Sequence, residues 1–329
     1  MKQKTLGQFF TNKNIFKNKF FLSWFKNIPI AKRHCIVEPF AGKNGLVDML
    51  VDLSLINQFQ SFDIEPQNEH VLTNDSILNF PKGFSVCITN PPFLAKNIAT
   101  RKNITANISP FSDLYEKCLD VCLNNCEYVA VIVPESFIVS PFFKTRLYGV
   151  ISLTQKSLFN QTEHPVCLAL FNPENSDDFN VYRDNKLLGR FHEKKEELTT
   201  IYPLTINDKI LFHKPNGQLG LINIDATDIN KKVSFCDGEN ILKSDVGYHS
   251  RLRTRIDILT PDNKKLSSTQ LKSIINICNK VLNDYRKTTQ DIFLTSFKGL
   301  RTDSRYRRRL DYSTARLIVS KAYSIYFKK

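Results

Sequence analysis

Short apolar runs alternate with helical patterns through the first half of the chain. Residues 35–37 and 58–62 predict strands, and residues 46–55 are apolar enough to form a packed helix between them. The runs 84–89 (FSVCIT), 128–133 (YVAVIV) and 166–171 (VCLALF) are apolar without alternation, which is typical of strands buried on both faces. Residues 114–123 predict a further helix. This alternation predicts an α/β domain with a mainly parallel sheet.

The pattern changes at residue 172. The segment NPENSDDFN combines proline, acids and amides, which is typical of a loop or linker, and the sequence after it is less regular. A length of 329 residues also fits two domains. We therefore predict an α/β domain over residues 1–172 and a C-terminal α+β domain over residues 173–329.

Charge is concentrated near the end of the chain. The formal net charge is +14 and the pI is about 9.3, and residues 241–329 hold 20 Lys+Arg against 7 Asp+Glu. Such a balance favours a polyanionic partner, with nucleic acid ahead of an anionic membrane. No apolar run approaches the roughly 18 residues of a spanning helix, and the N-terminus lacks the features of a signal peptide. We therefore predict a soluble, cytoplasmic protein that binds nucleic acid.

Eight cysteines occur in the chain, and three of them share a regular spacing. Cys118, Cys122 and Cys126 are four residues apart, which places them on one face of a helix. A zinc site would normally show an answering pair of cysteines or histidines, and the sequence offers none. The pattern favours thiols packed in the core and no metal site.

The sharpest chemical signal is the tetrapeptide Asn90-Pro91-Pro92-Phe93, directly after the run 84–89. Two prolines enforce an abrupt, rigid exit from a strand, at the end where open α/β sheets bind their ligands. The same residues also suit a stiff turn with no other role. As a chemical tool, the Asn90 side-chain oxygen and the Pro91 carbonyl accept both hydrogens of a planar amino group, and Phe93 offers a flat surface to a heterocycle.

This tetrapeptide resembles the catalytic motif of the amino-methyltransferases of DNA, in its adenine form. The resemblance implies a doubly wound, mainly parallel, seven-stranded Rossmann-like sheet and S-adenosyl-L-methionine as methyl donor. It further implies that Asn90, Pro91, Pro92 and Phe93 bind an adenine flipped out of double-stranded DNA.

Other segments resemble the cofactor motifs of the same family. Residues 38–42 (EPFAG) follow the first strand as its cofactor loop does, although GKNG at 42–45 departs from the usual Gly-x-Gly. Asp63, with Glu65 as the alternative, is placed for the ribose hydroxyls, and Asp75 for the cofactor's adenine amino group. Residues 7–11 (GQFFT) resemble the motif that closes over the methionine end. The residues expected to bind cofactor are Thr11, Glu38, Pro39, Phe40, Ala41, Gly42, Asp63, Ile64, Asp75 and Asn90.

The motif order is that of the gamma-type enzymes, in which a target-recognition domain follows the catalytic domain. By the same resemblance, residues 112–116 lie at the cofactor's adenine pocket. Phe159, with His164 as the alternative, supplies an aromatic face for the target base opposite Phe93. Core packing explains Phe159 equally well.

The C-terminal half resembles no family that we recognise, but its basic residues are informative. Arginines alternate at 251, 253 and 255, so an extended chain would place them on one face. A second group crowds beside Tyr306 and Tyr312. Guanidinium groups suit phosphates and guanine edges, which favours nucleic-acid contact over a merely solvated surface. The residues expected to bind DNA are Arg251, Arg253, Arg255, Lys298, Arg301, Arg305, Arg307, Arg308 and Arg309.

Together these features predict a site-specific adenine-N6 DNA methyltransferase, related to restriction-modification systems. We expect a monomer that acts separately from any cognate restriction endonuclease. Three alternatives stay open: RNA adenine as substrate, a protein glutamine amide, or a catalytically silent nucleic-acid-binding relative. The glutamine enzymes usually carry a helical domain ahead of the cofactor loop, where this chain has only about thirty residues. A silent relative would require a decayed cofactor site.

Overall fold

The computed structural model describes residues 14–101, 108–153, 165–198, 208–246, 252–303 and 305–327. For residues 97, 98, 101 and 297–299 only the backbone is described. The chain divides into two compact units, Met1–Phe191 and His192–Lys329. The first unit therefore extends past the predicted boundary at residue 172, because the residues beyond it add two more strands to its sheet.

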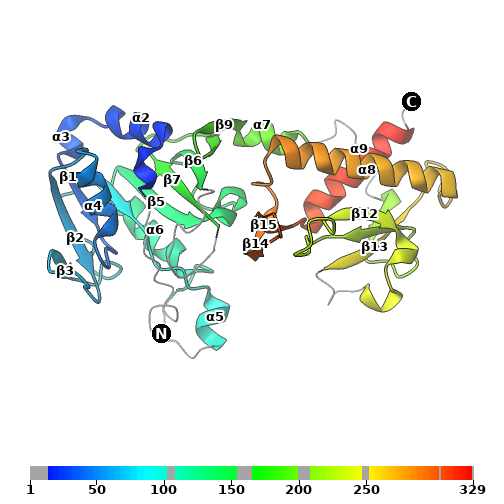
Figure 1. Ribbon diagram of the computed structural model, residues 1–329, viewed down its shortest axis with the longest axis horizontal. Helices are drawn as coiled ribbons and strands as arrows, with labels where there is room; N and C mark the ends of the chain where they lie inside the picture. Colours follow the sequence, from blue (N-terminus) through cyan, green and yellow to red (C-terminus); the bar gives the residue numbers. More distant parts are fainter. Residues whose placement is uncertain are drawn as a thin grey trace. The chain divides into compact units, whose positions relative to one another are not determined.

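The first unit contains a nine-stranded sheet with the order β3-β2-β1-β4-β5-β7-β6-β8-β9. In Figure 1 this sheet extends from the blue strands β2 and β3 through β5 to the green strands β6 and β9. The first five strands in this order run parallel to one another, and β7 is antiparallel to both of its neighbours. The strands are β1 (Cys35–Glu38), β2 (Gln58–Asp63), β3 (Val71–Thr73), β4 (Val86–Thr89), β5 (Tyr128–Pro134), β6 (Leu147–Leu153), β7 (Val166–Phe171), β8 (Asn180–Arg183) and β9 (Lys186–Arg190).

The mixed α/β architecture with a large, mostly parallel sheet is as the sequence predicts, but the strand count is not. The prediction of seven strands is wrong, because β8 pairs with β6 and β9 pairs with β8 at the edge of the sheet. All described residues of β4 and β7 are buried, as expected for apolar runs without alternation.

Helices cover both faces of this sheet. On one face η1 (Ile15–Lys17), α2 (Lys19–Asn27) and α4 (Gly45–Asp52) pack against the even-numbered side chains of β5, and Phe21, Trp24 and Phe25 of α2 are buried there. On the other face lie α6 (Leu114–Asn125) and η2 (Glu135–Val139). The Cys87 thiol exchanges hydrogen bonds there with Cys122 and Cys126, so these cysteines pack in the core. The short helices α3 (Ile30–Arg33) and α5 (Lys96–Arg101) complete the unit.

The second unit is built from an antiparallel sheet, a hairpin and two long helices. Its four-stranded sheet has the order β10-β13-β11-β12, and β14 and β15 form a separate pair. The helix α8 is amphipathic, and α8 and α9 pack together. No helix in the described ranges is long and apolar enough to cross a membrane. The elements are α7 (Phe191–Glu196, beginning on the last residue of the first unit), β10 (Ile210–Phe212), β11 (Leu219–Ile222), β12 (Ser234–Asp237), η4 (Gly238–Asn240), η5 (Lys243–Asp245), β13 (Arg253–Ile258), α8 (Ser268–Thr288), β14 (Thr295–Leu300), β15 (Tyr306–Arg309) and α9 (Tyr312–Phe327).

Candidate active site

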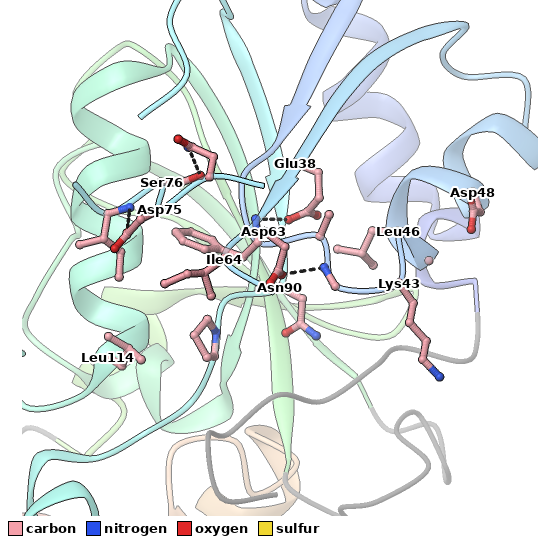
Figure 2. A pocket seen from close by; sticks show the side chains of 17 residues that line it. Glu38, Lys43, Leu46, Asp48, Asp63, Ile64, Asp75, Ser76, Asn90 and Leu114 are labelled. Atoms are coloured by element: carbon pink, nitrogen blue, oxygen red, sulfur yellow. Dashed lines mark hydrogen bonds between the residues drawn. The ribbon is translucent and has the colours of Figure 1, made fainter. Parts of the chain in front are cut away.

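A cavity of about 430 Å³ opens at the carboxyl ends of β1, β2 and β4. The chain reverses its direction of winding between the adjacent strands β1 and β4, and open α/β sheets bind ligands at such a switch point. We call this space the switch-point cavity (Figure 2). Its lining residues are Glu38, Phe40, Ala41, Gly42, Lys43, Gly45, Leu46, Asp48, Asp63, Ile64, Asn74, Asp75, Ser76, Ile77, Asn90, Pro92 and Leu114.

Asp63 ties the loop after β1 to the end of β2. Its Oδ2 accepts a 2.8 Å hydrogen bond from the Gly42 backbone N–H, and its Oδ1 accepts one of 2.8 Å from the Glu65 N–H. Gly42 has a φ of 52°, a left-handed conformation that glycine adopts without strain. The carboxylate is thus fixed at the cavity wall, and each oxygen retains further lone-pair capacity for a ligand.

Glu38, the last residue of β1, carries the most unusual group in the cavity. Its side chain is 1% exposed, and its Oε1 accepts hydrogen bonds from Thr89 Oγ1 at 2.5 Å and from the Phe40 N–H at 3.1 Å. Oε2 is buried too, and no group of the described residues donates a hydrogen bond to it. Burial raises the pKa of Glu38 to about 8; the two hydrogen bonds oppose this shift, and the negative charge of Asp63 adds to it.

Replacing Glu38 by glutamine tests the raised pKa of Glu38, because this shift makes the stability of the fold depend on pH. A carboxyl whose pKa is higher in the folded than in the unfolded protein binds more protons when folded, so stability falls as pH rises between the two values. For Glu38 this window runs from about 4.5 to about 8. We expect the wild type to lose up to about 1.4 kcal/mol per pH unit relative to Glu38→Gln across this window. Chemical denaturation of both proteins at several pH values would measure the difference. If the free energies of unfolding of the two proteins changed equally with pH, the raised pKa of Glu38 would be contradicted.

Asp75 lines the cavity from the turn that follows β3. Its Oδ1 accepts hydrogen bonds from the N–H groups of Ile77 (3.0 Å) and Leu78 (3.3 Å), which fixes the turn that follows. The Asn74 N–H donates to the Asp63 carbonyl at 2.9 Å, so the segment around Asp75 is bound to the end of β2. The three acidic residues thus come from the ends of three adjacent strands.

The tetrapeptide 90–93 leaves β4 directly at the cavity. Asn90 and Pro92 line the cavity, whereas Pro91 is buried beneath. The Phe93 ring meets the ring of Tyr115 edge to face, with centroids 6.0 Å apart and planes at 81°. Immediately afterwards the Leu94 N–H donates to Asp113 Oδ1 at 2.9 Å. The exit from β4 is therefore held on both sides, by the strand and by the start of α6.

The structure brings most of the expected cofactor residues to one space. Of the ten, Glu38, Phe40, Ala41, Gly42, Asp63, Ile64, Asp75 and Asn90 line the cavity, and Pro39 is buried without lining it. Thr11 lies outside the described residues, as do Phe159 and its alternative His164. Pro92 of the tetrapeptide and Leu114 of the segment 112–116 also line it. Seven further lining residues have no predicted role: Lys43, Gly45, Leu46, Asp48, Asn74, Ser76 and Ile77. Each lies within six residues of a predicted motif, because the same loop or helix turn continues around the cavity.

Three of the arginines expected to contact DNA lie inside the second unit instead. Arg255, Arg301 and Arg308 are 8%, 4% and 2% exposed. Arg255 donates to the carbonyls of Ile241 and Pro215. Arg301 donates to Asp225 and Asp303, and Arg308 donates to the Leu294 carbonyl. All three guanidinium groups are therefore occupied within the fold, which corrects the expectation that they contact nucleic acid.

The remaining basic residues differ in exposure. The side chains of Arg253 and Arg305 are 51% and 74% exposed, and Arg307 and Arg309 are half-buried. Arg251 and the Lys298 side chain lie outside the described part of the chain.

Asp225 is the centre of a buried ion-pair network in the second unit. Its carboxylate is fully buried and accepts two hydrogen bonds of 2.9 Å from Arg286 and one of 3.3 Å from Arg301. It also accepts backbone N–H groups of Val233 at 2.9 Å and Arg308 at 3.1 Å. Burial raises the pKa of this carboxyl, but the hydrogen bonds and charges of the arginines outweigh it and hold the pKa below its usual range.

Comparison with known proteins gives distant likenesses only. No protein-family model and no characterised protein matches the sequence. The structure is similar to a candidate class I S-adenosylmethionine-dependent methyltransferase from Listeria monocytogenes (14% identity, TM-score 0.38), covering 52% of this chain and 65% of that one. It is also similar to a type I restriction-modification methyltransferase subunit from Streptococcus thermophilus (13%, TM-score 0.37; 55% and 48%) and to the M protein of the type I restriction enzyme EcoKI (12%, TM-score 0.33; 90% and 67%). The matched region spans about half to two thirds of these chains.

Proposed function

We propose that this chain transfers the methyl group of S-adenosyl-L-methionine to the N6 amino group of adenine in double-stranded DNA. The observation that carries the proposal is a single shared cavity. Asn90 and Pro92, at the end of β4, line it together with Glu38 and Asp63, at the ends of β1 and β2. A rigid amino-group acceptor and a set of acidic groups thus face one space, as a reaction between a nucleoside cofactor and an amino group requires.

The residues of the cavity fit the proposed cofactor. A volume of about 430 Å³ lies within the range of small-molecule sites. The buried Glu38 Oε2 accepts no hydrogen bond from the described residues, and it suits a cationic or amino group as its partner. We assign Asp63 to the ribose hydroxyls, Asp75 to the adenine amino group, and the loop 38–42 to the methionine part. When bound, S-adenosyl-L-methionine supplies a methyl group on a positively charged sulfur.

The tetrapeptide supplies the chemistry at the acceptor. The Asn90 side-chain oxygen and the Pro91 carbonyl accept the two amino hydrogens, which directs the nitrogen lone pair at the methyl carbon. As the C–N bond forms from that lone pair, the C–S bond breaks and its electrons stay on sulfur, and one amino proton leaves to water. Phe93 stacks on the flipped base, and Tyr115 fixes the tilt of its ring. Phe159 remains our predicted second stacking face.

The second unit supplies the nucleic-acid contacts in this proposal. This unit carries most of the excess of basic over acidic residues. Of the arginines predicted to contact DNA, Arg253 and Arg305 have exposed side chains. We place the protein in a restriction-modification context, as a monomer that acts apart from any endonuclease.

The decisive experiment is methyl transfer from labelled S-adenosyl-L-methionine to unmethylated duplex DNA, with structured RNA in parallel. The nucleosides of each digest are then identified by mass. We expect N6-methyladenine in the DNA digest. Label in RNA alone would replace the substrate, and label in neither would overturn the proposal.

Arg305→Gln tests the nucleic-acid surface. Its side chain is 74% exposed and its ion pair with Asp303 is long, at 4.0 Å, so the guanidinium keeps donors that can reach a phosphate. Loss of one phosphate contact should weaken binding on all sequences and reduce the slope of log K against log salt by about 1. Lys231→Gln, an exposed basic residue of the same unit, is the matched control. Fluorescence anisotropy over a salt series measures both, and equal slopes in the two variants would exclude Arg305 from the interface.

A further inference from the structure

Acidic side chains outnumber basic ones in the lining of the switch-point cavity, in a chain whose net charge is +14. Glu38 contributes from β1, Asp63 from β2, Asp75 from the turn after β3 and Asp48 from α4. Lys43 is the one basic side chain among the described residues of the lining. The cavity is therefore charged opposite to the protein as a whole, which favours a ligand that carries positive charge.

Glu38 differs from the other three acids in its surroundings. Both oxygens of Asp63 accept backbone N–H groups, and Asp75 accepts two. Asp48 is exposed to water. Only Glu38 combines almost complete burial with an oxygen that accepts no hydrogen bond within the described residues. A buried acceptor of this kind is costly without a partner, so a cationic ligand gains more here than at the other carboxyls.

We propose that Glu38 makes the switch-point cavity selective for a positively charged cofactor, so that the methyl donor binds more tightly than the uncharged thioether left after transfer. This inference rests on the proposed function. The two molecules share their adenosine and amino-acid parts and differ in charge only at sulfur. A preference between them therefore measures how the cavity responds to charge at that atom. Such a preference would also favour exchange of spent product for fresh donor after each turnover.

Proton release is a second consequence. Without a ligand, burial and the neighbouring charge of Asp63 keep Glu38 protonated near neutral pH, since its pKa is about 8. Asp48 and Asp75 add negative charge around the same cavity, and Lys43 opposes it. A cation beside Oε2 favours the ionised form, so binding should expel the proton to solvent. Donor affinity should then rise with pH, by up to about tenfold per pH unit, as pH approaches the Glu38 pKa of about 8, and level off above it.

The test is isothermal titration calorimetry of the full chain with S-adenosyl-L-methionine and with S-adenosyl-L-homocysteine. Titrations in two buffers of different ionisation enthalpy count the protons released. We expect close to one proton for the donor near neutral pH, almost none for the thioether, and a donor preference of about tenfold or more at about pH 8.5. In Glu38→Gln both the proton release and the preference should disappear. The glutamine oxygen still accepts the hydrogen bonds of Thr89 and Phe40, so the loop is retained.

Asp48→Asn is the matched control, because it removes an acid of the same cavity that is exposed to water. It should keep the proton release. Equal proton release by both ligands would assign Glu38 to the amino group that they share, and would overturn the selectivity. Unchanged release in Glu38→Gln would overturn it as well. Absence of binding by either ligand would overturn the proposed function itself, which separates the two failures.

Discussion

Asn90→Ala is expected to lower the rate of methyl transfer by about 10²–10³-fold, while binding of cofactor and of DNA stays near normal. The substitution removes one acceptor of the amino hydrogens, and deletion of a single preorganised hydrogen-bonding group in an active site has effects of this size. Single-turnover transfer to duplex DNA measures the rate, and calorimetry and anisotropy measure the two binding steps.

The structure indicates that this substitution leaves the loop after β4 in place. Asn90 is half-buried at the cavity, and the backbone around it is fixed by two prolines, by β4 before it and by the Leu94–Asp113 hydrogen bond after it. Alanine therefore alters the acceptor without releasing the loop. Asn124→Ala is the matched control, because that side chain is exposed on α6 and, within the described residues, donates a hydrogen bond to Asp120. Near-normal turnover in Asn90→Ala would exclude Asn90 from the reaction.

The sequence predicts several of the residues that line the cavity, because they lie where a predicted strand ends. Glu38, Asp63 and Asn90 each follow directly on a predicted strand, and the carboxyl ends of neighbouring parallel strands meet at one edge of a sheet. The positions of these strands therefore suffice to predict that the three residues lie together. Lys43, in the loop before α4, and Asp48, in the first turn of α4, are not predicted because their place depends on how the chain turns into this helix, which apolar spacing does not encode.

The sequence does not distinguish a buried arginine from an exposed one. Arg301 and Arg308 stand in the most basic stretch of the chain, yet their contacts with Asp225 span 76 and 83 residues. Alternation predicts the strand that holds Arg253 and Arg255 and places both on one face. It does not reveal that the carbonyl of Ile241 covers only the second. Likewise, the composition of residues 172–180 indicates a loop but not the two edge strands that follow it. Long-range partners decide these cases.

Asp225→Ala is expected to destabilise the second unit by about 3–5 kcal/mol, the range for removing one partner of a buried ion pair. The carboxylate is fully buried between Arg286 and Arg301, and its loss leaves two guanidinium groups in the interior with their charges less compensated. The backbone N–H groups of Val233 and Arg308 lose their acceptor as well. Asp291 and Asp303 still pair with the two arginines, so we expect a weakened unit rather than an unfolded one.

The network also connects stability to nucleic-acid binding. Arg308 belongs to β15, and Arg307 Nε donates to the Asp225 backbone carbonyl at 2.9 Å, so the hairpin that presents Arg305 is anchored on this residue. Hydrogen exchange of β14 and β15 should therefore accelerate in Asp225→Ala, together with a lower midpoint in denaturant. Asp262→Ala, an exposed aspartate of the same unit, should change neither. If the hairpin exchanged at the wild-type rate although the unit was destabilised, its anchoring would come from β-pairing alone and DNA affinity should be unaffected. If the unit were destabilised and the hairpin also exchanged faster, the network of Asp225 and the buried arginines would hold Arg305 in place for nucleic-acid binding.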